Sequence, residues 1–311
     1  MTGSLVADDR PRPAAALRTM LAASVDYAGL FPPARQDMAT AVASYDRHGH
    51  EPESWMLGRF VVPAGRLSEL AEAHRAHAGE RAPWHLSVLI DGTAPAADLA
   101  RVGELNAAPG ARLVVDVIEA KLAAGADAAA IAGLARAVQG AGRFELYVEL
   151  PAEPDPVSLL RAIGAVHASA KVRTGGITAG AFPGAGALAR FIRRCAECGV
   201  PFKATAGLHH PLRACHRLTY EPDAPSGWMF GFLNVLLAAA LAHAGAEEQE
   251  IVASLELPSA EDVAFHDTGV RWRDRRLSTT LLRESRRALL RSFGSCSFEE
   301  PVRDLRTLGL L

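Results

Sequence analysis

The stretch "KVRTGGITAGAFPGAGALARFIRRCAECGVPFKATAG" at residues 171–207 decides the expected fold. It begins with a short β-type run at 171–175, continues through an Ala-, Leu- and Arg-rich stretch at 186–199, and ends on a second run at 202–207. The middle stretch closes on glycine, a common stop signal of helices, so it predicts a helix. The segment therefore predicts one strand–helix–strand unit, the repeating element of parallel α/β folds.

The same unit recurs along the chain of 311 residues. Six further β-type runs lie at 25–29, 56–62, 85–91, 112–118, 144–150 and 291–297. Up to the seventh run, successive starts lie about 25 to 32 residues apart, which is the length of a βα unit. Eight such units close into a TIM barrel of ~250 residues, so we predict an α/β fold, a single (β/α)8 TIM barrel over residues 1–311. An open doubly wound sheet is the alternative, which the lack of a G-x-G-x-x-G motif after an early strand disfavours.

Two segments exceed this repeat. A helix is expected near 13–24, before the first strand, and an insertion at 245–290 precedes the last strand. The insertion is expected to hold a helix, a hairpin with Thr268-Gly269 at its turn, and a second helix. The most apolar run, at 228–245, is short for a membrane span and predicts a buried helix.

Composition limits the possible functions. Hydrophobic residues make up 49% of the chain and charged residues 22%, as in globular proteins. A net charge of −2 predicts no binding to nucleic acid or membranes, and the Arg-rich stretch 271–291 is interpreted as a solvated helix face or subunit contact. Four cysteines are too few for a disulfide framework, and no signal-peptide pattern opens the chain. We therefore expect a cytoplasmic protein, a small polar or anionic substrate, and a homo-oligomer as one option.

Polar and apolar residues alternate in several predicted strands. The polar sets that share a face are Glu145, Tyr147 and Glu149; Lys171 and Arg173; and Lys203 and Thr205. If the apolar faces meet the helices, the polar faces line the barrel, where unpaired charges would be very costly. These side chains should then pair with each other or with a ligand. Two alternatives would also explain the alternation. The strands could belong to an open sheet with one solvent-exposed face, or the charges could form buried salt bridges that only fix the strand register.

The two lysines indicate a specific chemistry. In a dry, cation-rich pocket the pKa of a lysine falls, because burial and like charge both disfavour the ammonium form. A neutral lysine attacks a carbonyl carbon to form an imine, and a nearby carboxylate moves the protons. We predict Lys171 as the nucleophile, and Lys203 as the residue that lowers its pKa or as the nucleophile itself. Asp116 and Glu149 are predicted to transfer protons.

Five phrases in the chain occur in the same order as in a known family. They are "VDYAG" at 25–29, "VVDVIEAKLAAG" at 114–125, "KVRTGG" at 171–176, "FKATAGL" at 202–208 and "FGSCS" at 293–297. Together they resemble the strand phrases of class I deoxyribose-phosphate aldolases, which are (β/α)8 barrels that make and break carbon–carbon bonds through a lysine imine. The resemblance implies that Lys171 is the imine lysine, that Lys203 belongs to the strand-seven phrase, and that Asp116 matches the strand-four aspartate. It also implies that Gly294 and Ser295 lie near a substrate phosphate.

The chain departs from this family at two places. Arg173 stands in the family's strand-six Thr-Ser-Thr phrase, and Leu208, His209 and His210 replace its second strand-seven glycine and the region that follows. These departures favour a substrate other than a phosphosugar. The phrases "VRTGG", "FKATAGLHHP" and "FGSCSFEEP" also resemble an uncharacterised bacterial barrel family, which implies no function.

His209 and His210 follow the seventh strand, at the barrel end where active sites form. They are expected to bind substrate or to transfer protons. A divalent metal is the alternative, although neighbouring side chains on a strand point apart and one metal would take one of them more easily than both. In the structural alternative, the two histidines have no role in chemistry and only form part of a turn that ends at Pro211.

A glycine-rich turn, "TGGIT" at 174–178, follows the sixth strand, and Gly294 and Ser295 lie in the eighth. The backbone N–H groups at Gly175 and Gly176 are expected to cradle a phosphate or carboxylate, as are those at Gly294 and Ser295. An ordinary tight turn explains the glycines equally well. Asp26, in the first strand phrase, is placed where it could touch a ligand.

We therefore predict a class I, Schiff-base lyase of the aldolase type that acts on a small oxygenated carbonyl compound without a cofactor. Arg173, Thr205 and the histidines are predicted to bind the substrate. The first alternative is a metal-dependent TIM-barrel lyase or hydrolase that uses His209 and His210. The second is a non-catalytic barrel whose internal charges pair with each other.

Overall fold

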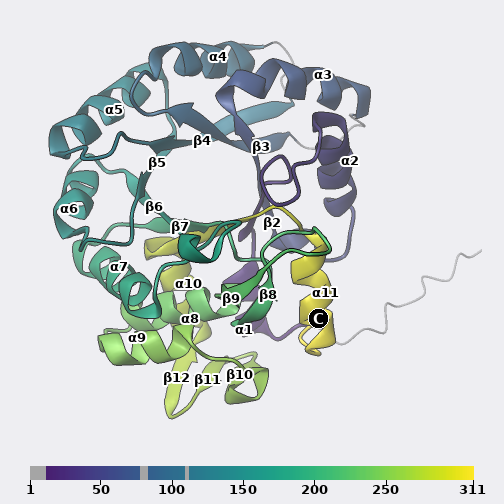
Figure 1. The fold of residues 1–311 in the computed structure, drawn as a ribbon, viewed down its shortest axis with the longest axis vertical. Coiled ribbons are helices and arrows are strands. Elements are labelled where there is room, and N and C mark those ends of the chain that lie inside the picture. Colours follow the sequence, from purple (N-terminus) through teal and green to yellow (C-terminus); the bar gives the residue numbers. More distant parts are fainter. Residues whose placement is uncertain (1–11, 78–82, 109–111) are drawn as a thin grey trace, which may run out of the picture.

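The strands of the computed structural model close into an eight-stranded parallel barrel, which confirms the predicted (β/α)8 fold (Figure 1). The structure describes residues 12–77, 83–108 and 112–311. The order around the barrel is β1-β13-β7-β6-β5-β4-β3-β2. The barrel strands are β1 (Val25–Tyr27), β2 (Leu57–Pro63), β3 (Trp84–Asp91), β4 (Leu113–Lys121), β5 (Glu145–Leu150), β6 (Ser169–Arg173), β7 (Phe202–Thr205) and β13 (Leu290–Ser295).

An α-helix follows each barrel strand, and these helices form the outer ring in Figure 1. They are α2 (Met38–His48), α3 (Leu67–His77), α4 (Ala96–Ala107), α5 (Ala128–Ala141), α6 (Val157–Ala165), α7 (Ala185–Cys198), α8 (Phe232–His243) and α11 (Glu299–Thr307). The side chains of Asp37 and Asp127 accept hydrogen bonds from backbone N–H groups and so cap α2 and α5. Helix α7 ends at Gly199, whose φ of 63° is the left-handed conformation expected of a glycine stop.

The barrel strands fall within a few residues of their predicted positions. The largest difference lies in β4, which was predicted to end at 118 and continues to Lys121, whereas the predicted runs 25–29 and 202–207 end early, at Tyr27 and Thr205. After β7 the cause is the backbone of Ala206 and Gly207, whose φ values of 65° and 75° cannot continue a strand. This turn redirects the chain toward His209.

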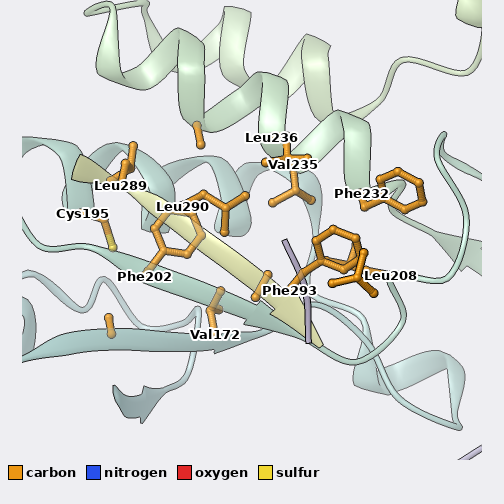
Figure 2. Packing of buried hydrophobic residues seen from close by; sticks show 14 of the residues in the cluster. Val172, Cys195, Phe202, Leu208, Phe232, Val235, Leu236, Leu289, Leu290 and Phe293 are labelled. Carbon is orange, nitrogen blue, oxygen red and sulfur yellow. The ribbon is translucent and has the colours of Figure 1, made fainter. Parts of the chain in front are cut away.

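The hydrophobic core lies between the barrel and the helices (Figure 2). Val172 of β6, Phe202 of β7 and Phe293 of β13 point outward, toward the helices. The rings of Phe293 and Phe232 stack with their centroids 5.1 Å apart, which joins β13 to the start of α8. Helix α8 is buried along almost its whole length, because it packs against α7, α9 and α10 as well as the barrel. The apolar run 228–245 therefore contains the buried helix that was predicted.

The segment 245–290 contains more structure than predicted. Helix α9 (Glu248–Leu255) is followed by an antiparallel sheet of β10 (Val263–His266), β11 (Gly269–Trp272) and β12 (Arg275–Ser278), and then by α10 (Thr279–Ala288). The expected hairpin thus has a third strand, β12. Its sequence was interpreted as part of a charged stretch, because Arg275, Arg276 and Ser278 are exposed and only Leu277 is buried. The sheet packs against α1 (Ala15–Leu21), the helix before the barrel.

A second small sheet was not expected from the sequence. Strands β8 (Ala214–Arg217) and β9 (Ser226–Met229) form an antiparallel hairpin between β7 and α8. Short 3-10 helices lie at Ser54–Met56, Ala64–Arg66, Ala179–Ala181 and Ala260–Asp262. Among the described residues, the helices are all too short or too polar to traverse a lipid bilayer.

Candidate functional site

A cavity of about 330 Å³ lies at the carboxyl end of the barrel strands. Its wall comes from the ends of β6, β7 and β13 and from the loop after β1. The lining residues are Ala28, Phe31, Pro32, Pro33, Val61, Leu89, Glu119, Lys171, Arg173, Gly176, Ile177, Lys203, Thr205, Ala206, Gly207, His209, Gly294 and Cys296. The strand ends of TIM barrels are where catalytic residues gather, so this cavity is the candidate active site.

Lys171 and Lys203 lie next to each other in this cavity. They are register partners on the neighbouring strands β6 and β7, so both side chains project from the same level of the barrel. Lys171 is 5% exposed and Lys203 is 1% exposed. The strand register therefore brings together the two lysines that the sequence predicted as partners.

Glu119 of β4 lies between the two lysines. Its Oε2 is 2.7 Å from Lys171 Nζ, and its Oε1 accepts a hydrogen bond of 2.5 Å from Lys203 Nζ. Ser87 of β3 donates a further hydrogen bond of 2.6 Å to Oε1. Sequence reasoning missed Glu119, although it lies three residues after Asp116 in the same strand phrase.

A β-bulge in β4 explains why Glu119 was missed. In a regular strand, residues three apart point to opposite faces, so Asp116 and Glu119 could not both face the barrel interior. The pairing of β3 with β4 shifts by one residue, from Leu86–Val115 to Ser87–Val117, so Asp116 is the extra residue. Both acidic side chains then lie inside the barrel, at different levels. The sequence carries no clear signal for this shift.

Asp116 lies away from the lysine pair, contrary to the prediction that it serves them. Its carboxylate accepts hydrogen bonds of 2.7 and 3.0 Å from the guanidinium of Arg59, and it lies 3.0 Å from His85 Nδ1. Asp116 does not line the cavity. The bulge places it at the level of Arg59, nearer the amino ends of the strands, where it neutralises a partly buried cation.

Two further carboxylates complete the cluster. Asp26 of β1 accepts a hydrogen bond of 2.6 Å from Lys203 Nζ and another of 2.7 Å from the Ser292 hydroxyl. Glu149 of β5 lies 3.1 Å from Lys171 Nζ. Each lysine thus contacts Glu119 and one carboxylate of its own.

These contacts favour the charged forms of Lys203 and Glu119. Burial disfavours the ammonium form of Lys203, but the attraction of Asp26 and Glu119 outweighs it and raises the pKa of Lys203 to about 12. Burial also opposes the ionised form of Glu119, yet Lys171 and Lys203 hold the pKa of that carboxyl well below its usual range. The prediction of a lowered lysine pKa in a cation-rich pocket is therefore wrong for Lys203, because carboxylates outnumber the lysines in the cluster.

Glu149 does not line the first cavity but borders a second one, together with Arg173. This cavity has a volume of about 530 Å³ and lies beside the loop that follows β4. Arg173 lines both cavities, and its guanidinium makes no ion pair with an acidic group of the described residues. Positive charge is therefore available to a ligand at the cavity mouth.

The two histidines point to different surroundings. His209 is buried and lines the cavity, and its Nδ1 lies 3.3 Å from the Ser295 hydroxyl. His210 pairs with Asp304 at 2.6 Å, stacks on His216 with ring centroids 3.5 Å apart, and does not line the cavity. Only His209 is therefore placed to touch a ligand in this cavity, and the two rings do not converge on one site.

The remaining predicted residues lie in or beside the wall. Thr205, Gly176 and Gly294 line the cavity, whereas Gly175 and Ser295 lie behind it. At Gly175 a Cβ atom would come within 2.4 Å of the Phe182 ring, so this glycine allows close packing of the loop. Across the described residues, no cluster of three or more His, Cys, Asp or Glu side chains has the geometry of a metal site.

No family model matches the chain, and no curated protein sequence matches it significantly. Two solved structures share part of its fold. A mutant of FabK from Thermotoga maritima has 14% identity and a TM-score of 0.37 over 65% of this chain, and the match spans 59% of the FabK chain. Dihydrodipicolinate synthase from Rhodopseudomonas palustris has 13% identity and a TM-score of 0.29 over 76% of this chain and 79% of that chain. Both similarities are too low to assign a function.

Proposed function

We propose that the protein is a class I lyase of the aldolase type, which acts on a small carbonyl compound through an imine with Lys171. The observation that carries this proposal is the pair of adjacent buried lysines that opens onto a cavity and shares three carboxylates. Imine catalysis needs a lysine nucleophile and acid–base groups within hydrogen-bond reach, and the cluster supplies both. A purely structural ion cluster would need no adjoining cavity.

The surroundings of the two lysines favour Lys171 as the nucleophile. Two carboxylates hold Lys203 on either side and raise its pKa, so Lys203 stays an ammonium group. The second carboxylate beside Lys171 is Glu149, which borders the second cavity and so has a path to solvent. Glu149 is thus the residue that takes a proton from Lys171.

The imine step balances without a cofactor. Lys171 gives one proton to Glu149, and its neutral amine then forms a C–N bond to the carbonyl carbon. The proton on Glu149 and a second N–H proton pass to the carbonyl oxygen, which leaves as water. The resulting iminium accepts the electron pair of the carbon–carbon bond that breaks. Lys203 stays charged and stabilises negative charge that develops on the substrate.

Arg173 supports an anionic substrate. Its guanidinium lies at the cavity mouth without an acidic partner among the described residues, and it is suited to bind a carboxylate or phosphate in bidentate fashion. The substrate we propose is therefore a small carbonyl compound with one anionic group. The cytoplasmic location, the absence of a cofactor and the option of a homo-oligomer remain predictions from the sequence.

Borohydride trapping tests the proposal directly. The chain has three lysines, Lys121, Lys171 and Lys203, and Lys121 is exposed outside the cavity, so it serves as an internal control. The protein is incubated with a panel of small aldehydes, ketones and keto acids, reduced with borohydride, digested and analysed by mass spectrometry. We expect an adduct on Lys171, which the Lys171→Met variant loses and the Lys121→Met variant keeps. A panel that leaves Lys171 and Lys203 unlabelled would favour the non-catalytic barrel.

A further inference from the structure

The β7 loop places a histidine opposite the lysine cluster. Strand β7 ends at Thr205, two residues after Lys203, and the left-handed turn at Ala206 and Gly207 leads the chain to His209. Lys203 and His209 thus line the same cavity from one strand–loop unit. The His209 side chain packs against the end of β13, where Ser295 and Cys296 lie.

Hydrogen bonds around Nδ1 of His209 determine which ring nitrogen carries the proton. The Ser295 hydroxyl donates its hydrogen to the Ser297 carbonyl at 2.7 Å, so its oxygen is left as an acceptor. Nδ1 lies 3.3 Å from that oxygen and 3.5 Å from Glu300 Oε2. Cys296 Sγ, at 3.8 Å, is only a weak donor, so the two oxygen acceptors decide: Nδ1 carries the hydrogen and Nε2 keeps its lone pair.

The surroundings also keep the ring neutral. Burial lowers the pKa of His209 to about 4, and repulsion from His210 and His216 adds to this effect. Nε2 makes no hydrogen bond to the described residues. It is also absent from the fully buried polar atoms that lack a hydrogen-bond partner, so it is accessible. It is therefore a neutral acceptor that remains open on the side of the cavity that His209 lines.

The cavity otherwise offers mainly donors. Lys171, Lys203 and Arg173 are donors only, and both oxygens of Glu119 already have lysine partners. His209 Nε2 is thus a free side-chain acceptor that cannot donate, whereas the Thr205 hydroxyl, which also lines the cavity, can do both. A ligand that fills the cavity must direct a hydrogen-bond donor at it, because a buried acceptor without a partner costs free energy.

We propose that His209 is the group that accepts the hydroxyl proton of the β-hydroxy carbonyl substrate, which cleavage by an aldolase-type lyase requires. The inference rests on the proposed imine at Lys171. As the Cα–Cβ bond of the iminium breaks, its electron pair passes to the imine nitrogen and gives an enamine. The hydroxyl O–H bond breaks at the same time, its proton goes to Nε2, and its oxygen becomes the carbonyl oxygen of the released aldehyde. The proton then returns to Cα of the enamine, and water releases the second product.

Two measurements test this role, and the first does not depend on the reaction. The ¹⁵N spectrum of the protein with labelled histidine, assigned with the His209→Gln variant, reports which ring nitrogen of His209 is protonated. We expect a hydrogen on Nδ1 and a bare Nε2 at pH 7. A hydrogen on Nε2, or a charged ring at that pH, would overturn the inference even if an imine forms at Lys171.

The second measurement separates imine formation from bond cleavage. With a carbonyl compound that lacks a β-hydroxyl group, His209→Gln should give as much Lys171 adduct as the unmodified protein, which also shows that the variant folds. With the matching β-hydroxy compound, release of the aldehyde should fall 10²- to 10⁴-fold, the range of general acid–base catalysis. The control is His210→Gln, which changes a neighbouring histidine outside the cavity and should leave both readouts unchanged.

The outcomes distinguish the two proposals. Equal aldehyde release by His209→Gln and the unmodified protein would contradict the role of His209 and leave the imine proposal intact. Absence of any adduct in the unmodified protein would contradict the imine proposal, and the proton transfer with it. Loss of the adduct in His209→Gln alone would assign the histidine to imine formation and would also contradict the role proposed here.

Discussion

Glu119 Oε1 lies 2.5 Å from Lys203 Nζ, and the other oxygen of the same carboxylate lies 2.7 Å from Lys171 Nζ. One buried carboxylate therefore joins the two lysines that line the cavity. The contact holds Lys203 as an ammonium group and leaves Lys171 as the lysine whose second carboxylate, Glu149, borders the second cavity.

Replacement of Lys203 should destabilise the protein strongly. Lys203→Met leaves Asp26 with no lysine and Glu119 with only Lys171, and breaking a buried ion pair by removing one partner typically costs about 3–5 kcal/mol. Urea unfolding monitored by circular dichroism measures the free energy of unfolding. Arg66→Met, which breaks an exposed ion pair with Glu69, is the control and should cost no more than about 1 kcal/mol. Equal losses in both variants would contradict the buried cluster.

The Lys203 cluster should make stability depend on alkaline pH. The pKa of Lys203 is raised from 10.5 to about 12 in the folded state, so its contribution is complete below pH 10.5 and is lost as the pH rises through about 12. This difference corresponds to about 2 kcal/mol. Unfolding measured from pH 8 to pH 12 should show this loss, and Lys203→Met should lack it. If the unmodified protein and Lys203→Met lost the same free energy of unfolding over this pH range, the result would contradict a raised pKa of Lys203.

His209 should make the protein sensitive to mild acid. Its pKa is about 4 in the folded state and 6.5 when unperturbed, so below pH 6.5 the unfolded chain binds a proton that the folded protein does not. The free energy of unfolding should therefore fall by about 3 kcal/mol from this residue between pH 7 and pH 4. His209→Gln should remove that part of the decline. Glu300, His210, His216 and Cys296 surround the ring and remain in both proteins, so the difference between the two profiles isolates His209.

Arg173 should affect substrate binding more than the chemical step. Under the proposed function, Arg173→Ala removes the cation that meets the anionic group, so KM for anionic carbonyl substrates should rise about 10- to 100-fold with a smaller change in kcat. Steady-state kinetics with an anionic substrate and its neutral ester would show this contrast. Arg161→Ala, on the exposed face of α6, provides the matched control. An equal effect on both substrates would argue against anion binding at Arg173.

Gly175 should tolerate no side chain. In Gly175→Ala the new Cβ would come within 2.4 Å of the Phe182 ring, and such overpacking typically costs about 1–3 kcal/mol. Thermal unfolding measures the loss, and a second change, Phe182→Leu, should recover part of it by making room. Gly186→Ala is the control, because nothing lies within 4 Å of a Cβ there. Unchanged stability of Gly175→Ala would show that the loop moves freely.

The sequence by itself determined the barrel and most of the polar side chains inside it. The period of the βα unit, the glycine stop at Gly199 and the alternation in 144–150 are local features, and they predicted the strands within a few residues. Lys171 and Lys203 could also be paired in advance, because consecutive strands of a parallel barrel are neighbours and their side chains alternate with a fixed period.

Only the tertiary structure decided how the charges pair. Glu119 reaches the lysines because a bulge at Asp116 changes the facing of every later residue in β4, and a shift of one residue leaves no clear signal in composition or spacing. Closure of the barrel brings Asp26 of β1 to Lys203 of β7, which are 177 positions apart in the chain. The pKa of a buried group depends on the sum of such contacts, so the charge state of the lysines could be determined only once the barrel had closed.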